Sequence, residues 1–115
     1  MIERIDGGPR MSEAVVHNGV AYLAGQVSSG GATDIGGQTR EVLAAIDALL
    51  ARAGTDKTRV LRAQIFLADM ADFPGMNAVW DQWVVAGHTP ARATVQAALA
   101  KAQWKVEIVV TAALP

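Results

Sequence analysis

The 115-residue chain is predicted to fold as an α+β domain in which one sheet carries two helices on the same face. Three patterns predict this class: short alternating strands, two amphipathic helical segments, and turns rich in glycine between them. The expected element order is β-β-β-α-β-α-β-β, without an internal linker or repeat. We expect a single domain over residues 1–115, because one hydrophobic core usually serves roughly 100–200 residues.

The individual elements follow from their residue patterns. Strands are indicated by period-two alternation, and helices by apolar residues that recur at steps of three or four. Asn18-Gly19 favours a two-residue turn with positive φ angles, and therefore a hairpin. Residues 28–37, SSGGATDIGG, predict a loop. The expected strands cover residues 1–5, 14–18, 20–24, 59–67, 90–97 and 104–113, and the expected helices run from residue 33 or 34 to 53 and from 72 to 86.

The ends and the apolar side of the helices can also be predicted. Gly54 and Gly87 are expected to end the two helices, because glycine readily adopts the left-handed conformation found at helix ends. Asp72 is expected to cap the start of the second helix. Trp80 and Trp83 lie on the apolar side of that helix, so we interpret them as core residues rather than as a base-stacking platform.

Composition narrows the possible functions. The formal net charge is −1, the pI is about 6.0 and no block of lysine or arginine occurs, which argues against a nucleic-acid or anionic-membrane partner. The absence of cysteine excludes a disulfide framework, a thiol nucleophile and a thiolate metal site. His17 and His88 are too few and too far apart to predict a metal site. Since no signal-peptide pattern or membrane-spanning stretch is visible, a cytoplasmic location is expected.

The second face of the predicted sheet mixes apolar and polar side chains. A face of this kind suits packing against other copies of the chain. We therefore expect a homo-oligomer whose ligand sites lie where subunits meet. The side chains assigned to this face are Val60, Arg62, Gln64, Phe66, Arg92, Thr94, Val109 and Thr111.

Arg92 and Glu107 are charged residues set into apolar strands. If the last two strands formed a hairpin with Val95 opposite Trp104, Arg92 would face Glu107 and the two charges would compensate each other. Alternatively, both charges line a half-buried cleft. There the guanidinium would bind a carboxylate, and the glutamate would orient or deprotonate a water molecule. Spacing alone leaves the ion pair and the ligand site equally open.

Five short motifs occur in order along the chain. They are AYLAGQ at 21–26, QT at 38–39, FLADMADFPGMN at 66–77, TPARATVQ at 89–96 and KVEI at 105–108. Together they resemble the Rid/YjgF family of reactive-intermediate deaminases over residues 14–113. The stretch from Phe66 to Leu114 is most similar to the small YoaB-like branch of bacterial homologues.

The resemblance implies a chorismate-mutase-like sheet of about six strands with two helices on one face, assembled as a homotrimeric barrel with clefts between subunits. It also implies that the last strand lies inside the sheet. The implied chemistry is hydrolysis of 2-imino or 2-enamino acids to 2-keto acids and ammonia, without a metal or an organic cofactor. The alternative is a non-catalytic or chaperone-like trimer that binds a small carboxylate such as a 2-keto acid.

The family's functional residues can be carried onto this sequence. Its carboxylate-binding arginine corresponds to Arg92, and its water-activating glutamate corresponds to Glu107. Gly25 would offer backbone contacts to the ligand, and Asn77 matches the family's asparagine at the cleft. These assignments are implied by the resemblance and predict a substrate-binding cleft.

The sequence departs from the family pattern at the same cleft. Thr94 stands where deaminating members usually carry a cysteine, and Ala24 stands where a serine is common. The segment PRMSEAVV offers Met11 or Ser12 where a tyrosine is usual. Some relatives are called endoribonucleases, but this chain has neither a basic stripe nor paired histidines for RNA cleavage.

Overall fold

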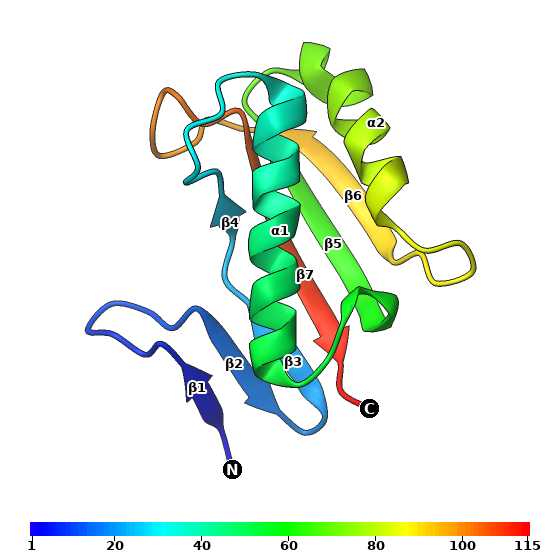
Figure 1. Cartoon of the computed structure of the whole chain (residues 1–115). Coiled ribbons are helices and arrows are strands. Elements are labelled where there is room, and N and C mark those ends of the chain that lie inside the picture. The colour runs from blue at the N-terminus through cyan, green and yellow to red at the C-terminus, as the bar shows by residue number, and fades with distance from the viewer.

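The computed structural model describes all residues from 1 to 115 as a mixed seven-stranded sheet with two α-helices on one face (Figure 1). The strand order is β1-β2-β3-β7-β5-β6, and the short β4 also pairs with β7. The strands are Glu3–Ile5 (β1), Ala14–His17 (β2), Val20–Leu23 (β3), Gln26–Val27 (β4), Val60–Leu67 (β5), Ala91–Gln96 (β6) and Val106–Ala113 (β7). The helices are Ile35–Ala53 (α1) and Phe73–Trp83 (α2). The expected six strands are present, and β4 is the additional one.

The N-terminal hairpin confirms the turn prediction. Strands β2 and β3 pair antiparallel up to His17 and Val20. The φ angles of Asn18 and Gly19 are 50° and 77°, so both turn residues adopt the left-handed region that this type of hairpin turn requires. Strand β1 then pairs with β2 and extends the sheet at its N-terminal edge.

Helix α1 begins at Ile35, directly after the predicted start, and ends at Ala53 as predicted. The Asp34 side chain accepts a hydrogen bond from the Gly37 backbone N–H, and Gly54 closes the helix with a φ of 90°. The second glycine pair of the predicted loop, which includes Gly37, lies instead in the first helical turn. A Cβ atom on Gly37 would lie only 2.7 Å from Asp34 Oδ1 and 2.9 Å from Ala32 Cβ, so this turn has no room for a side chain.

Helix α2 is shorter than predicted at its C-terminal end. It ends at Trp83, since the Val84 backbone turns extended, and Gly87 adopts its positive φ of 84° in a later turn. The Asp72 side chain makes no capping hydrogen bond. Asp69 instead accepts from the Ala71 backbone N–H and opens a 3-10 turn, Met70–Asp72, that leads into α2. The apolar pattern continues past the helix because Val84, which is extended, also packs against the core.

Strand pairing contradicts the hairpin between the last two strands. Strands β5 and β6 are parallel neighbours, and α2 supplies the crossover that a parallel pair needs. Strand β7 lies between β3 and β5 and is antiparallel to both. The last strand is therefore central, as the resemblance implied, and β5 separates it from β6.

The core lies between the helices and one face of the sheet. A register shift between Val60 and Arg62 places Val60 on this covered face and leaves Leu61 51% exposed, so the assignment of Val60 to the second face is wrong. The buried apolar cluster comprises Ala14, Val16, Ala21, Leu23, Val42, Leu43, Ile46, Leu49, Leu50, Val60, Ala63, Ile65, Leu67, Met76, Val79, Trp80, Trp83, Val106, Ile108, Val110 and Ala112. Neither helix has the length and apolar character needed to cross a membrane.

Gln38 joins two loops that are distant in sequence. Its side chain is 2% exposed, and its Nε2 donates to the backbone carbonyls of Ala32 at 3.1 Å and Gln103 at 2.9 Å. Its Oε1 accepts from the Lys105 backbone N–H at 2.8 Å. The β4–α1 loop and the β6–β7 loop are therefore held side by side, as the cyan and orange segments of Figure 1 show.

We expect Gln38→Leu to lower the free energy of unfolding by about 1–3 kcal/mol, because it removes the partner of two carbonyls and one N–H at a part-buried position. Urea unfolding followed by circular dichroism, at one fixed protein concentration, measures this change. Gln82→Leu on the exposed side of α2 is the control. Equal losses in the two variants would contradict a clamping role for Gln38.

Candidate functional site

The predicted arginine lies under α2. Arg92 pairs in register with Ala63 of β5, so its side chain is on the helix-covered side of β6. The guanidinium carbon lies 5.2 Å from the ring centroid of Trp80 and 5.8 Å from that of Phe73. Arg92 is half-buried, and its side chain takes no part in the hydrogen bonds or the single ion pair of the chain. Its N–H groups therefore have no partner within one chain.

Two buried polar atoms on β6 and α2 also lack partners. Thr94 follows Arg92 by two residues on the same face of β6, and its Oγ1 makes no hydrogen bond. Asn77 lies four residues after Phe73 and three before Trp80, hence on the same side of α2, and its Oδ1 is also without a donor. Buried polar atoms are nearly always hydrogen-bonded. We call Arg92, Thr94 and Asn77, where α2 lies against β6, the arginine half. Its polar groups remain free to form further hydrogen bonds at the predicted ligand site.

The predicted glutamate lies on the other face of the sheet. Glu107 of β7 is in register with Phe66 of β5 and Val27 of β4, which places it on the uncovered face. A Cβ atom on Gly25 would lie 2.1 Å from Glu107 Oε2, so only glycine admits the carboxylate at this point. Ala24 precedes Gly25 in the connection between β3 and β4. We call Ala24, Gly25 and Glu107 the glutamate half.

A single chain does not bring the two halves together. Ala63 and Phe66 of β5 point to opposite faces, because their positions differ by an odd number. Arg92 beside Ala63 and Glu107 beside Phe66 are therefore separated by the sheet itself. The prediction that both charges share one face is wrong, as is the placement of Thr94 on that face. The reason is the register of a parallel neighbour, which alternation within one strand cannot reveal.

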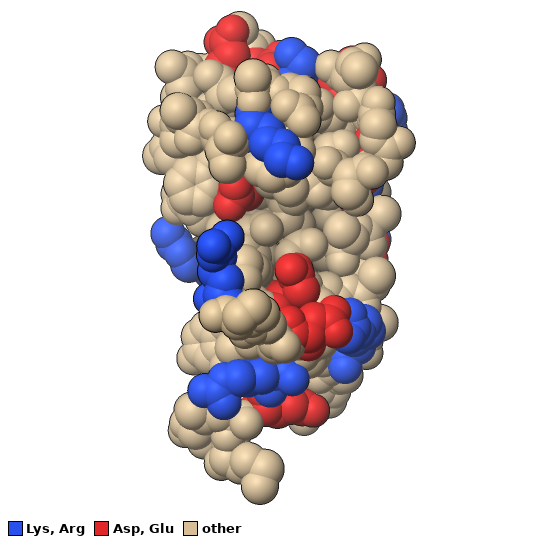
Figure 2. Space-filling view, turned by 90° about the vertical axis from the view of Figure 1, so that its left-hand side faces the viewer, with Lys and Arg blue, Asp and Glu red and all other residues tan.

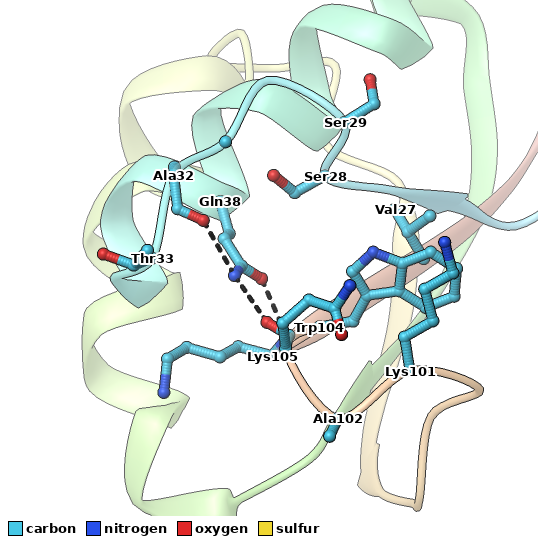
Figure 3. A pocket seen from close by; sticks show the side chains of 12 residues that line it. Val27, Ser28, Ser29, Ala32, Thr33, Gln38, Lys101, Ala102, Trp104 and Lys105 are labelled. Carbon is cyan, nitrogen blue, oxygen red and sulfur yellow. Dashed lines mark hydrogen bonds between the residues drawn. The ribbon is translucent and has the colours of Figure 1, made fainter.

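The largest cavity adjoins the glutamate half. It measures about 630 Å³, within the range of small-molecule sites, and lies between the two loops that Gln38 joins (Figure 3). Val27, which is in register with Glu107, lines this cavity, and so does Lys105, two residues before Glu107. Figure 3 shows the Lys101 side chain beside the Trp104 ring, with the Lys101 ammonium 5.1 Å from the ring centroid. Sequence reasoning missed the cavity because its walls are two loops that are distant in sequence, and no pattern along the chain showed that Gln38 joins them.

Gln26, the last residue of the AYLAGQ motif, has structural partners within the chain. Gln26 donates to Glu13 at 3.3 Å and to the Ala24 carbonyl at 3.0 Å, so its amide is engaged within the chain.

No group of three or more metal-ligating side chains is present. At the end of α1, hydrogen bonds from Arg52 lower the pKa of the Asp6 carboxyl group. This exposed pair joins α1 to the segment after β1 and lies in neither half.

Comparison with known proteins identifies the family. The sequence pattern described as Endoribonuclease L-PSP matches residues 1–114. The chain belongs to this family, the YjgF/Rid family. A RutC family protein from Haemophilus ducreyi is 50% identical over 114 residues, covering 99% of this chain and 97% of the relative. The RutC family protein YoaB from Escherichia coli is 49% identical over 113 residues and covers 98% of both chains. The predicted likeness to YoaB is thus confirmed.

Solved structures show the same YjgF/Rid fold. A YjgF family protein from Neisseria meningitidis superposes with a TM-score of 0.97 at 49% identity, covering 100% of this chain and 96% of the other. A Rid family protein of unknown function from Yersinia pestis superposes with a TM-score of 0.87 at 31% identity, covering 94% and 90%. The arrangement of two helices on a mixed sheet is therefore a family property.

We expect Thr94→Val to raise the free energy of unfolding by about 1 kcal/mol, because it removes a buried hydroxyl that has no partner and keeps the β-branched shape. Urea unfolding at a fixed protein concentration measures the gain. Thr111→Val, on the uncovered face of β7, is the matched control and should change stability less. A loss of stability in Thr94→Val would show that the hydroxyl has a structural partner.

Proposed function

We propose that this protein hydrolyses reactive 2-imino or 2-enamino acids, of the 2-aminoacrylate type, to 2-keto acids and ammonia in clefts between subunits of a homotrimer. The observation that carries the proposal is the separation of Arg92 from Glu107. Each has no partner within its own chain, and the two lie on opposite faces of one sheet. A site that uses both is complete only where the arginine half of one chain meets the glutamate half of another.

The chemistry needs two operations that these side chains can perform. The planar guanidinium of Arg92 would bind the substrate carboxylate through two parallel hydrogen bonds. Glu107 would accept a proton from water as the water oxygen adds to the C=N carbon. The C–N bond then breaks, ammonia leaves with the transferred protons, and the water oxygen remains as the keto oxygen. The imine is already electrophilic, so the proposed step requires only that it be positioned beside one oriented water, and it invokes no metal or organic cofactor.

The uncovered face of the sheet supports self-association. Tyr22, Leu61 and Val95 are 50%, 51% and 44% exposed in the isolated chain. Their burial against other copies would remove apolar surface from water, which favours an oligomer. The trimeric, chorismate-mutase-like barrel and the cytoplasmic location belong to the proposal and rest on the family resemblance and the composition.

A second candidate function is binding without catalysis. Ala24 and Thr94 replace the serine and cysteine usual in deaminating members, and this change favours a trimer that binds a small 2-keto acid. That function predicts saturable binding of 2-ketobutyrate with no acceleration of imine decay.

RNA cleavage, which the family's description names, has less support, because acidic and basic groups alternate on the side of the molecule shown in Figure 2. The two histidines, His17 in β2 and His88 after α2, also lie on separate elements.

Mixed trimers provide the decisive experiment for a shared site. We expect Arg92→Ala and Glu107→Gln each to abolish hydrolysis of imine generated by a pyridoxal-phosphate lyase while leaving the trimer assembled. Equal co-expression of the two variants should restore about one cleft in four, because half of the arginine sides and half of the glutamate sides are intact. Sedimentation and imine decay measure the outcome. A mixture as inactive as either variant alone would contradict a site built from two chains.

We expect Gly25→Ala to reduce imine hydrolysis by about 100-fold or more, because the new methyl group would displace the Glu107 carboxylate that serves as general base. Gly8→Ala is the control, since a Cβ there would lie 3.6 Å from the Met11 carbonyl in ordinary contact. The rate of imine decay at a fixed protein concentration measures both. Activity near that of wild type in Gly25→Ala would remove Glu107 from the mechanism.

A further inference from the structure

Arg92 is a half-buried cation with no acidic partner in its chain. Removing a charge from water is costly unless other groups compensate for it. The only groups shown to interact with this guanidinium are two aromatic rings, those of Phe73 and Trp80. The faces of aromatic rings carry partial negative charge and attract cations within about 6 Å of the ring centroid. Both rings lie within that range.

The two rings are placed by α2 itself. Phe73 and Trp80 are seven residues apart, which is two helical turns, so both project from the same side of the helix. Trp80 is 5% exposed and belongs to the apolar core, so its ring is held by packing. The ring of Trp83 lies 5.3 Å from that of Trp80, but the cation near it is Lys57. Trp80 therefore has a contact with Arg92 that its neighbour Trp83 lacks.

We propose that Phe73 and Trp80 are positioning residues for Arg92, and that they form an aromatic platform that keeps its N–H groups free for a ligand carboxylate. An acidic side chain would also compensate the charge, but it would occupy the same N–H groups that the ligand needs. Ring faces compensate the charge without accepting those hydrogen bonds. The platform thus stabilises a cation that remains ready to bind an anion, and its role rests on the proposed use of Arg92.

The platform restricts the residue that can serve at position 92. A guanidinium is planar and can lie over a ring while its edge presents two N–H groups to a carboxylate. A lysine ammonium could also be attracted by the rings, but it lacks this planar pair of donors. The aromatic platform and the planar guanidinium therefore act together. An Arg92→Lys change should lose the bidentate contact even though the positive charge remains.

Titration with 2-ketobutyrate tests the platform through affinity rather than turnover. We expect Trp80→Leu to weaken binding about tenfold, the effect of losing one partly buried cation–π contact, and Trp80→Phe to stay within about threefold of wild type. Trp83→Leu is the matched control: it removes an indole from the same helix and should lower Tm but change affinity by less than about twofold. Phe73→Leu, at a half-buried position, supplies a second test if Trp80→Leu does not fold.

Nuclear magnetic resonance gives a readout that does not depend on any ligand. Protons held over the face of an aromatic ring are shifted upfield, so the Arg92 side-chain protons should be shifted in wild type and in Trp83→Leu. The shift should diminish in Trp80→Leu and partly return in Trp80→Phe. Equal weakening of binding by Trp80→Leu and Trp83→Leu, or absent binding of 2-ketobutyrate by wild type, would overturn the platform. Binding with this pattern but no imine hydrolysis would uphold the platform and contradict only the proposed enzymatic function.

Discussion

The parallel register between β5 and β6 is the constraint on which the candidate site depends. It places Arg92 beside Ala63 and Thr94 beside Ile65, so β6 sends its polar residues under α2 rather than onto the open sheet. The antiparallel register of β7 against β5 sends Glu107 to the opposite face. Because a sheet is one residue thick, no rotamer change in a single chain can bring these two charges together. The geometry therefore favours a site completed by association.

In the isolated chain, this arrangement leaves several polar and charged groups without hydrogen-bond partners. Arg92 is compensated only by ring faces, Glu107 has no hydrogen bond, and two polar atoms of the arginine half have no partner. Each of these groups would be more stable with a partner in water or protein. Groups without partners that gather in one region are typical of a site whose partners come from outside the chain.

The rest of the fold provides rigidity around these groups. Glu41 of α1 accepts hydrogen bonds from the Ser28 hydroxyl at 3.0 Å and from the Ala32 backbone N–H at 2.8 Å. Gln38, one turn earlier in the helix, holds the same loop to the β6–β7 loop. The β4–α1 loop is thus anchored to α1 by two side chains. The cavity lined by Val27 and Lys105 therefore lies between two loops that hydrogen bonds fix in place.

The sequence by itself determined the hairpin at Asn18-Gly19, the helical segment of α1 and the core role of Trp80. It also singled out Arg92 and Glu107 as charges within apolar strands. These features could be predicted because turn angles, helix caps and apolar periods depend on a few neighbouring residues. Tertiary structure alone decided the central place of β7, the bulge that buries Val60, the end of α2 at Trp83 and the separation of Arg92 from Glu107. These features depend on which strands become neighbours and in what register. Alternation within one strand gives the relative faces of its own residues, but only pairing with another strand decides which of those faces is buried.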